Sequence, residues 1–218
     1  ILEKNSEKFT AANQKNLGEV LNPLKEKINL FEKKVVPIPM PTGEILEVRE
    51  GINGTFSVHR DTKENLELRS ENLGIAGDGD FRIAQKMLGH MSTLLNKNAR
   101  DILSIGFGAG ETTACLAINK LNRLDCVEIA PEVVQIALKF FKHINLGDEL
   151  DRKVNMIYMD GKNYLYLTEK KYDIIINGAN IPTHSGSAPL FTKEHFQNAL
   201  EHLNPGGLFI TKFHLVST

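Results

Sequence analysis

The sequence lacks three features that would each indicate a specialised class of protein. Its 26 Lys and Arg residues are balanced by 27 Asp and Glu residues, and without a basic stripe we expect no nucleic-acid partner. No apolar run approaches the length that crosses a bilayer, so membrane attachment would come only through regions outside this chain. Cys115 and Cys126 lie in apolar segments without a pairing pattern, which predicts two buried, reduced thiols in a cytoplasmic protein.

What is present is the composition of an ordinary globular protein. The 218 residues are 41% hydrophobic and 24% charged, enough for one sizeable core or a core with a small accessory domain. Residues 1–43 combine a weak helical stripe with the segment VVPIPMPTG, which predicts a helical arm and a Pro-rich linker. Residues 44–76 hold three alternating segments, ILEVRE, GTFSVHR and NLELRS, which predict a small N-terminal antiparallel β domain.

Residues 77–218 carry the pattern of an α/β fold. From Asp101 onward, near-continuous apolar strands alternate with amphipathic helices. This alternation predicts a parallel sheet with helices on both faces, because such strands are buried on both sides. The fold class predicted for the chain is therefore α/β, preceded by the small β domain.

Two helices of this region have apolar positions that we expect to face the core. One helix spans residues 81–95, and the other begins after the expected cap Thr192. Their inward positions are predicted to be Ile83, Met87, Met91 and Leu94 in the first, and Phe196, Ala199, Leu200 and Leu203 in the second.

A glycine turn follows the first strand of the α/β region. Gly106, Gly108 and Gly110 would let the backbone approach a ligand before the next helix starts. Glu128 and Asp160 end the next two strands, where the carboxyl ends of a parallel sheet meet. A carboxylate there can accept ribose hydroxyls, and another can meet an adenine edge, so the set predicts a nucleoside site. Alternatively, the two acids only cap the helices that follow.

Other ligand motifs are missing from the sequence. The dinucleotide fingerprint needs a glycine where Glu111 stands, and no P-loop for nucleoside triphosphates occurs. The histidines and cysteines show no metal-ligand spacing, so no metal is predicted.

Several segments together resemble the spermidine synthase (polyamine aminopropyltransferase) family, in its divergent spermidine-synthase-like branch. In chain order they are EGINGTFSVHRD, GDGDFRIAQKMLGHM, ILSIGFGAGET, CVEIAPEVV, YMDGKNYL and SGSAPLFTKEHF. The resemblance implies an S-adenosylmethionine-type Rossmann fold after the small β domain. It also allows a homodimer, and it implies a natural polypeptide that continues past Thr218, because the family fold extends beyond its fifth strand.

The same resemblance implies roles for individual residues. Glu128 matches the family's ribose-binding acid, and Asp160 with Gly161 matches its adenine-binding pair, beside the glycine turn already described. The implied ligand is S-adenosylmethionine, decarboxylated S-adenosylmethionine or methylthioadenosine, with a small molecule as second substrate.

The sequence departs from the family at its acids. Ala109 stands where the family has the Asp that holds the aminopropyl amine, and Asn177 and Asn180 occupy the acid positions after the fourth strand. The family's Tyr-His-Glu segment is here Ala84-Gln85-Lys86. Asn provides neither a base nor a countercharge, and an amine acceptor must lose a proton before it attacks.

The sequence therefore predicts a spermidine-synthase-like transferase whose acceptor is not an ordinary polyamine. Two alternatives stay open: an S-adenosylmethionine-dependent methyltransferase, which can act by positioning alone, and a non-catalytic nucleoside-binding or regulatory protein. Catalytic residues are unassigned; the candidates in the loop after the fourth strand are Asn177, Asn180, His184 and Ser185. The last two are adjacent and point apart, which favours loop packing over a nucleophile pair.

Overall fold

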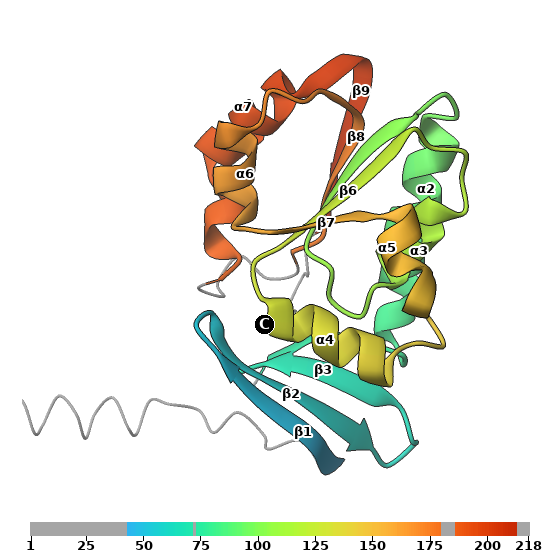
Figure 1. Ribbon diagram of the computed structural model, residues 1–218, viewed down its shortest axis with the longest axis vertical. Coiled ribbons are helices and arrows are strands. Elements are labelled where there is room, and N and C mark those ends of the chain that lie inside the picture. The colour runs from blue at the N-terminus through green and yellow to red at the C-terminus, as the bar shows by residue number, and fades with distance from the viewer. Residues whose placement is uncertain (1–42, 72, 180–185, 213–218) are drawn as a thin grey trace, which may run out of the picture. The chain divides into compact units, whose positions relative to one another are not determined.

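The computed structural model describes residues 43–71, 73–179 and 186–212 (Figure 1). Every described residue belongs to one compact unit, Pro41–Thr218. The predicted helical arm lies outside the described residues. Within the described part, no helix combines the length and the apolar character that a membrane span requires.

A four-stranded antiparallel sheet opens the described chain. Its strands pair in chain order and are β1 (Gly43–Gly51), β2 (Gly54–Asp61), β3 (Leu66–Ser70) and β4 (Leu73–Gly77). The predicted β domain is present, but β4 was missed as a strand. The segment is rich in glycine because its neighbours leave no room: a Cβ at Gly77 would lie 2.6 Å from the Leu66 carbonyl oxygen. With so few side chains, no alternation could be read from it.

The second sheet has five parallel strands in the order β7-β6-β5-β8-β9. The strands are β5 (Asp101–Ile105), β6 (Arg123–Glu128), β7 (Asn155–Tyr158), β8 (Tyr172–Asn177) and β9 (Leu203–Thr211). The chain first builds outward from β5 through β6 to β7, then crosses back to β8 and β9. At such a reversal the loops diverge, which leaves a crevice at the carboxyl ends of the central strands.

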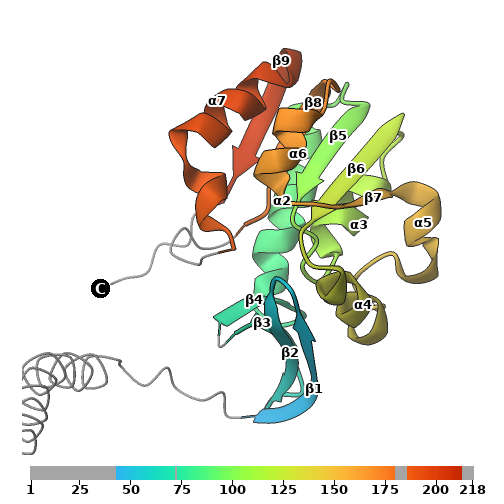
Figure 2. The same ribbon diagram turned by 60° about the vertical axis from the view of Figure 1, so that its left-hand side comes forward.

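Helices cover both faces of this sheet, as the sequence predicted (Figure 2). One face packs against α2 (Phe81–Leu95), α3 (Glu111–Ala117) and α5 (Leu150–Lys153), which follows the 3-10 turn η1 (Gly147–Glu149). The other face packs against α6 (Gly161–Leu167) and α7 (Lys193–Glu201), which follows η2 (Ala188–Phe191). Alternate residues of β5 show this division, with Ile102 in the first core and Leu103 in the second.

Helix α4 (Pro131–Phe140) joins the two sheets. Val134 and Ala137 pack in the core of the parallel sheet, while Val133 and Ile136 pack against Phe56 and other side chains of the small sheet. Figure 1 shows α4 between the two sheets. Two sides of α4 are therefore buried, and this packing holds the small sheet against the carboxyl ends of the central strands.

The predicted inward face of α2 was wrong. Ile83, Met87, Met91 and Leu94 are between 46% and 68% exposed. The buried face instead consists of Gln85, Leu88, Gly89 and Ser92. Glycine is required at position 89 because α3 lies very close: a Cβ on Gly89 would be 2.4 Å from that of Cys115.

The remaining predictions of burial had mixed outcomes. On α7, Ala199 is fully buried and Phe196 half-buried, but Leu200 is 60% exposed and was wrongly placed inside. Cys115 and Cys126 are both buried and unpaired, as predicted, and burial raises the pKa of the Cys126 thiol to about 12.

Candidate functional site

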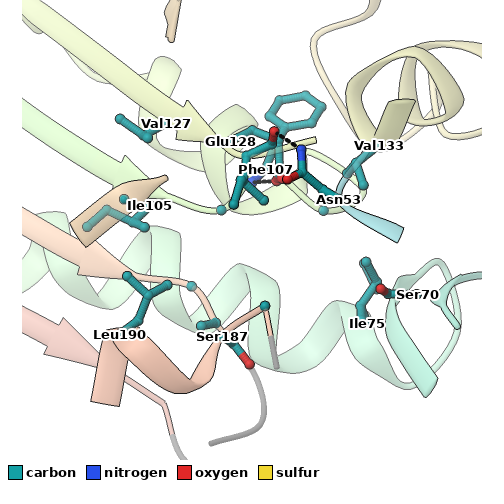
Figure 3. A pocket seen from close by; sticks show the side chains of 18 of the residues that line it. Asn53, Ser70, Ile75, Ile105, Phe107, Val127, Glu128, Val133, Ser187 and Leu190 are labelled. Carbon is teal, nitrogen blue, oxygen red and sulfur yellow. Dashed lines mark hydrogen bonds between the residues drawn. The ribbon is translucent and has the colours of Figure 1, made fainter. Parts of the chain in front are cut away.

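A cavity of about 160 Å³ lies where the small sheet covers the carboxyl ends of β5, β6 and β8 (Figure 3). A single water molecule needs about 10–15 Å³ of such space, so this is more than a packing defect. Its apolar lining comes from Phe56, Leu73, Ile75, Ala76, Ile105, Phe107, Val127, Ile129, Val133, Ala179 and Leu190. Its polar lining comes from Asn53, Ser70, Gln85, Thr112, Glu128, Asp160, Ser187 and Lys212. Apolar walls with few polar groups are typical of a small-molecule site.

The predicted glycine turn forms the floor of this cavity. Gly106 and Gly108 line it with φ angles of 89° and 56°, a left-handed backbone that other residues adopt at a cost. Gly110, also left-handed, is the N-cap of α3 and lies outside the lining. A Cβ there would be 2.7 Å from the Phe107 ring, so Gly110 serves the packing of the turn.

Glu128 ends β6 and is 8% exposed. Its Oε2 accepts a hydrogen bond from the Phe107 N–H at 2.8 Å, and its Oε1 accepts one from the Ala130 N–H at 3.0 Å. Burial raises the pKa of this carboxyl, while these backbone N–H groups act in the opposite direction. The backbone N–H groups of Gly108 and Ile129 also act on this carboxylate, so the glycine turn and the residues after β6 fix its position at the cavity.

Asp160 and Gly161 lie at the end of β7 and line the cavity. The Oδ1 of Asp160 caps α6 by accepting a hydrogen bond from the Asn163 N–H at 2.8 Å. The capping alternative therefore holds for one oxygen, and the described residues provide no hydrogen bond to Oδ2. A Cβ on Gly161 would lie 2.4 Å from Ile105 Cγ2, so the helix start packs directly on β5.

Asn177, a candidate from the loop, does not line the cavity. Its side chain is fully buried, its Nδ2 donates to the Leu190 carbonyl oxygen at 2.9 Å, and its Oδ1 accepts from the Ala179 N–H at 3.3 Å. This amide ties β8 to η2. Asn180, His184 and Ser185 lie outside the described residues.

Ala109 and Lys86, two further departures from the family, also lie outside the lining of the cavity. Ala109 is fully buried in the core between α4 and the small sheet, among side chains that include Val58 and Ile136. Lys86 is 48% exposed, with its Nζ 3.8 Å from Glu111 Oε1. Gln85, by contrast, lines the cavity, and its Nε2 donates to the Gly77 carbonyl oxygen.

Acids of the Gly-rich segment before α2 also lie elsewhere. Asp78 accepts a hydrogen bond from the Leu66 N–H at 2.6 Å and pairs with His143 Nε2 at 2.9 Å. Neither Asp78 nor Asp80 lines the cavity. Among the described residues, no group of three or more His, Cys, Asp or Glu side chains could hold a metal ion.

Sequence reasoning missed several residues of the cavity. Asn53 is at the β1–β2 turn, and its Nδ2 donates to the Ile129 carbonyl oxygen at 2.8 Å across the two sheets. Ser70, Thr112 and Lys212 also line the cavity without having been singled out. Lys212 follows β9 directly, and the polar position after a strand was the one signal that could have identified it.

A small antiparallel sheet followed by a five-stranded parallel sheet covered by helices is the Rossmann-like fold of the spermidine synthases. Residues 82–215 match the family model for the spermine/spermidine synthase domain, and the chain belongs to this family. It is similar to the polyamine aminopropyltransferase of Methanocaldococcus jannaschii, with 34% identity over 60% of this chain and 44% of that protein. The enzyme of the same name from Clostridium botulinum is 30% identical over 65% of this chain and 50% of its own length.

Solved structures agree on the fold. A spermidine synthase in complex with the transition state analogue AdoDATO superposes with a TM-score of 0.71 and 20% identity, over 77% of this chain and 57% of that one. Spermidine synthase from Thermotoga maritima gives a TM-score of 0.67 at 19% identity, over 77% and 55% of the two chains. The chain spans about half the length of the curated relatives just named.

Proposed function

We propose that this chain binds an S-adenosylmethionine-type nucleoside in the cavity and transfers a group from it to a small acceptor other than an ordinary polyamine. One observation supports the proposal above all: Glu128 and Asp160 line the same cavity as the glycine turn. They stand at the ends of neighbouring strands, β6 and β7, where the carboxyl ends of a parallel sheet commonly bind a nucleoside. The relatives are transferases by name, and one structural neighbour is a complex with AdoDATO.

The acceptor is the part of the proposal that departs from the relatives. Among the described lining residues, only Glu128 and Asp160 are acids, and both already accept backbone hydrogen bonds. A protonated amine needs a base to attack, and a polyamine needs countercharges to be held. The described lining offers no further carboxylate on the β8–β9 side for either purpose.

Methyl transfer from S-adenosylmethionine is the second candidate. It needs only positioning when the nucleophile is already unprotonated. The same shortage of acids in the described lining favours it, since such a cavity orients a ligand without removing a proton.

Calorimetric titration tests the nucleoside part of the proposal. S-adenosylmethionine, decarboxylated S-adenosylmethionine and methylthioadenosine are each titrated into the protein, with adenine alone as the control. Methylthioadenosine should bind more tightly than adenine, because only the nucleoside offers ribose hydroxyls to Glu128. Equal or absent binding of all four compounds would contradict the proposal.

A further inference from the structure

Lys212 is a cation on the wall of the cavity. The residue follows β9 directly, after Thr211, which lies opposite Asn177 of β8 in the sheet register. Its side chain is half-buried and lines the cavity. Within the described part of the chain, its Nζ has no hydrogen bond or ion pair, and the two acids of the lining, Glu128 and Asp160, accept backbone hydrogen bonds.

The strand order places this cation across the cavity from Glu128 and Asp160. Glu128 and Asp160 end β6 and β7 on one side of the central strand β5, and Lys212 follows β9 on the other side. Neighbouring strands are about 4.8 Å apart, so β6 and β9 are separated by about 14 Å. A nucleoside between Glu128 and Asp160 would leave the Lys212 side free for the group on its sulfur or for the acceptor.

A half-buried ammonium group in such a place is stabilised by a nearby anion. Burial alone lowers the pKa of Lys212 to about 8, so the group is still mainly charged near pH 7. A half-buried charge beside apolar walls interacts more strongly with a ligand charge than it would in water. A carboxylate would be attracted there, whereas a second ammonium would be repelled.

We propose that Lys212 binds a carboxylate of the ligand on the β8–β9 side of the cavity, so that the site selects substrates that carry one. This inference rests on the proposed nucleoside-binding function. It adds a positive charge on the β8–β9 side of the cavity that selects among ligands. The carboxylate has two potential sources, an S-adenosylmethionine-type donor with its carboxyl group intact or the acceptor. In either case Lys212 is a specificity residue and takes no part in bond making.

Matched ligand pairs distinguish the two sources. The donor pair is S-adenosylhomocysteine and its decarboxylated form, which differ only in one carboxylate. The acceptor pair is ornithine and putrescine, which differ in the same way and are titrated with methylthioadenosine at saturation. We expect the carboxylate-bearing member of at least one pair to bind about ten- to a hundredfold more tightly, the usual effect of one charged hydrogen bond.

Variants of Lys212 connect that preference to its charge. Lys212→Met should abolish it, and Lys212→Glu should reverse it in favour of the amine. Methylthioadenosine, which has no charged group, should bind all three proteins within about twofold, which also reports that the variants are folded.

The outcomes separate the two proposals. Binding of methylthioadenosine without a Lys212-dependent preference in either pair overturns the role of Lys212 and leaves nucleoside binding intact. Failure of methylthioadenosine to bind the unmodified protein overturns the nucleoside site and this inference with it. A preference that survives Lys212→Glu assigns the carboxylate to another residue and also overturns the inference.

Discussion

The Glu128 carboxylate accepts a hydrogen bond from the backbone N–H of Phe107, 2.8 Å away, and so joins the end of β6 to the glycine turn after β5. One side chain thus shapes the turn and presents oxygen atoms to the cavity. Substitutions at this position should affect both the turn and the ligand.

Replacing Glu128 by Ala should weaken methylthioadenosine binding by about 1–3 kcal/mol, the cost of losing a charged hydrogen bond. Calorimetry measures the affinity, and circular dichroism checks the fold. Glu149→Ala is the matched control, because Glu149 is an exposed acid of η1 that does not line the cavity. Unchanged affinity in Glu128→Ala would remove Glu128 from the binding site.

Aminopropyl transfer to putrescine should be too slow to be useful in the natural polypeptide. General-base catalysis is typically worth about a hundred- to ten-thousandfold, and no described lining acid is free to provide it. An assay with decarboxylated S-adenosylmethionine and putrescine measures the rate. Rapid formation of spermidine would show that a base reaches the site from outside the described residues.

Restoring the family acids should not rescue that reaction. Ala109 and Asn177 are both fully buried and neither lines the cavity, so Ala109→Asp with Asn177→Asp would place carboxylates in the interior. Burying an unpaired charge is costly, and we expect a lower midpoint in urea denaturation without any gain in turnover. A rescued rate would mean that these side chains can turn toward the ligand.

A buried polar network at the opposite end of the parallel sheet should make stability depend on pH. Asp125 is fully buried and accepts hydrogen bonds from Tyr172 Oη at 2.6 Å, Asn155 Nδ2 at 2.8 Å and Lys170 Nζ at 2.9 Å. Burial raises the pKa of Asp125, but these partners outweigh it and the pKa is lowered. The stabilisation is therefore complete above the ordinary pKa of Asp and is lost as the pH falls through the lowered value.

Asp125→Asn should accordingly lower the free energy of unfolding at pH 7 by about 1–3 kcal/mol, since it leaves buried donors unpaired. The difference from the unmodified protein should shrink in urea titrations below about pH 4. Asp148→Asn is the control, because Asp148 is 92% exposed and its pair with Lys142 should contribute little. A difference that stays constant with pH would contradict the role given to the Asp125 charge.

His195 should make the free energy of unfolding depend on pH in a second range, above the range in which Asp125 titrates. Its ring is fully buried and has no hydrogen-bond partner among the residues that the structure describes, and burial lowers its pKa to about 4. The unfolded state binds the proton more tightly, so stability falls as the pH drops from about 6.5 toward that value. At pH 5 the loss should be about 2 kcal/mol, by the same relation.

His195→Leu should remove this loss, so that the unfolding free energy changes less between pH 7 and pH 5. Chemical denaturation at the two pH values measures it. His90→Gln, a change at an exposed position of α2, should leave the pH dependence as it is. The same pH dependence in His195→Leu would show that another group titrates in this range.

Much of the fold could be predicted because it depends on local patterns. The central strands β5, β6 and β8 are buried on both faces, and their near-continuous apolar sequence shows this directly. The orientation of α2 could not be predicted, because the contact between Gly89 and Cys115 joins segments that the sequence does not relate. Helical spacing alone favoured the apolar side of that helix, which is exposed.

In the candidate site, too, some residues could be predicted from the sequence and others could not. Glu128 and Asp160 could be found because the carboxyl ends of parallel strands meet at one edge, so position in the chain implies position in space. Asn53 and Lys212 reach the cavity only through the packing of the small sheet and the placement of β9 at the far side of β8. The resemblance likewise gave positions in sequence without the direction of the Ala109 and Asn177 side chains.

The hydrogen bond from Asn53 to the Ile129 carbonyl oxygen has a thermodynamic consequence. A ligand in this cavity touches residues of both sheets, and it can bind only while the sheets are docked. By mass action, binding then stabilises the docked state over any form in which the small sheet has opened, by an amount that grows with ligand concentration. Amide protons of β2 and β3, far from the glycine turn in sequence, should therefore exchange more slowly once the cavity is filled.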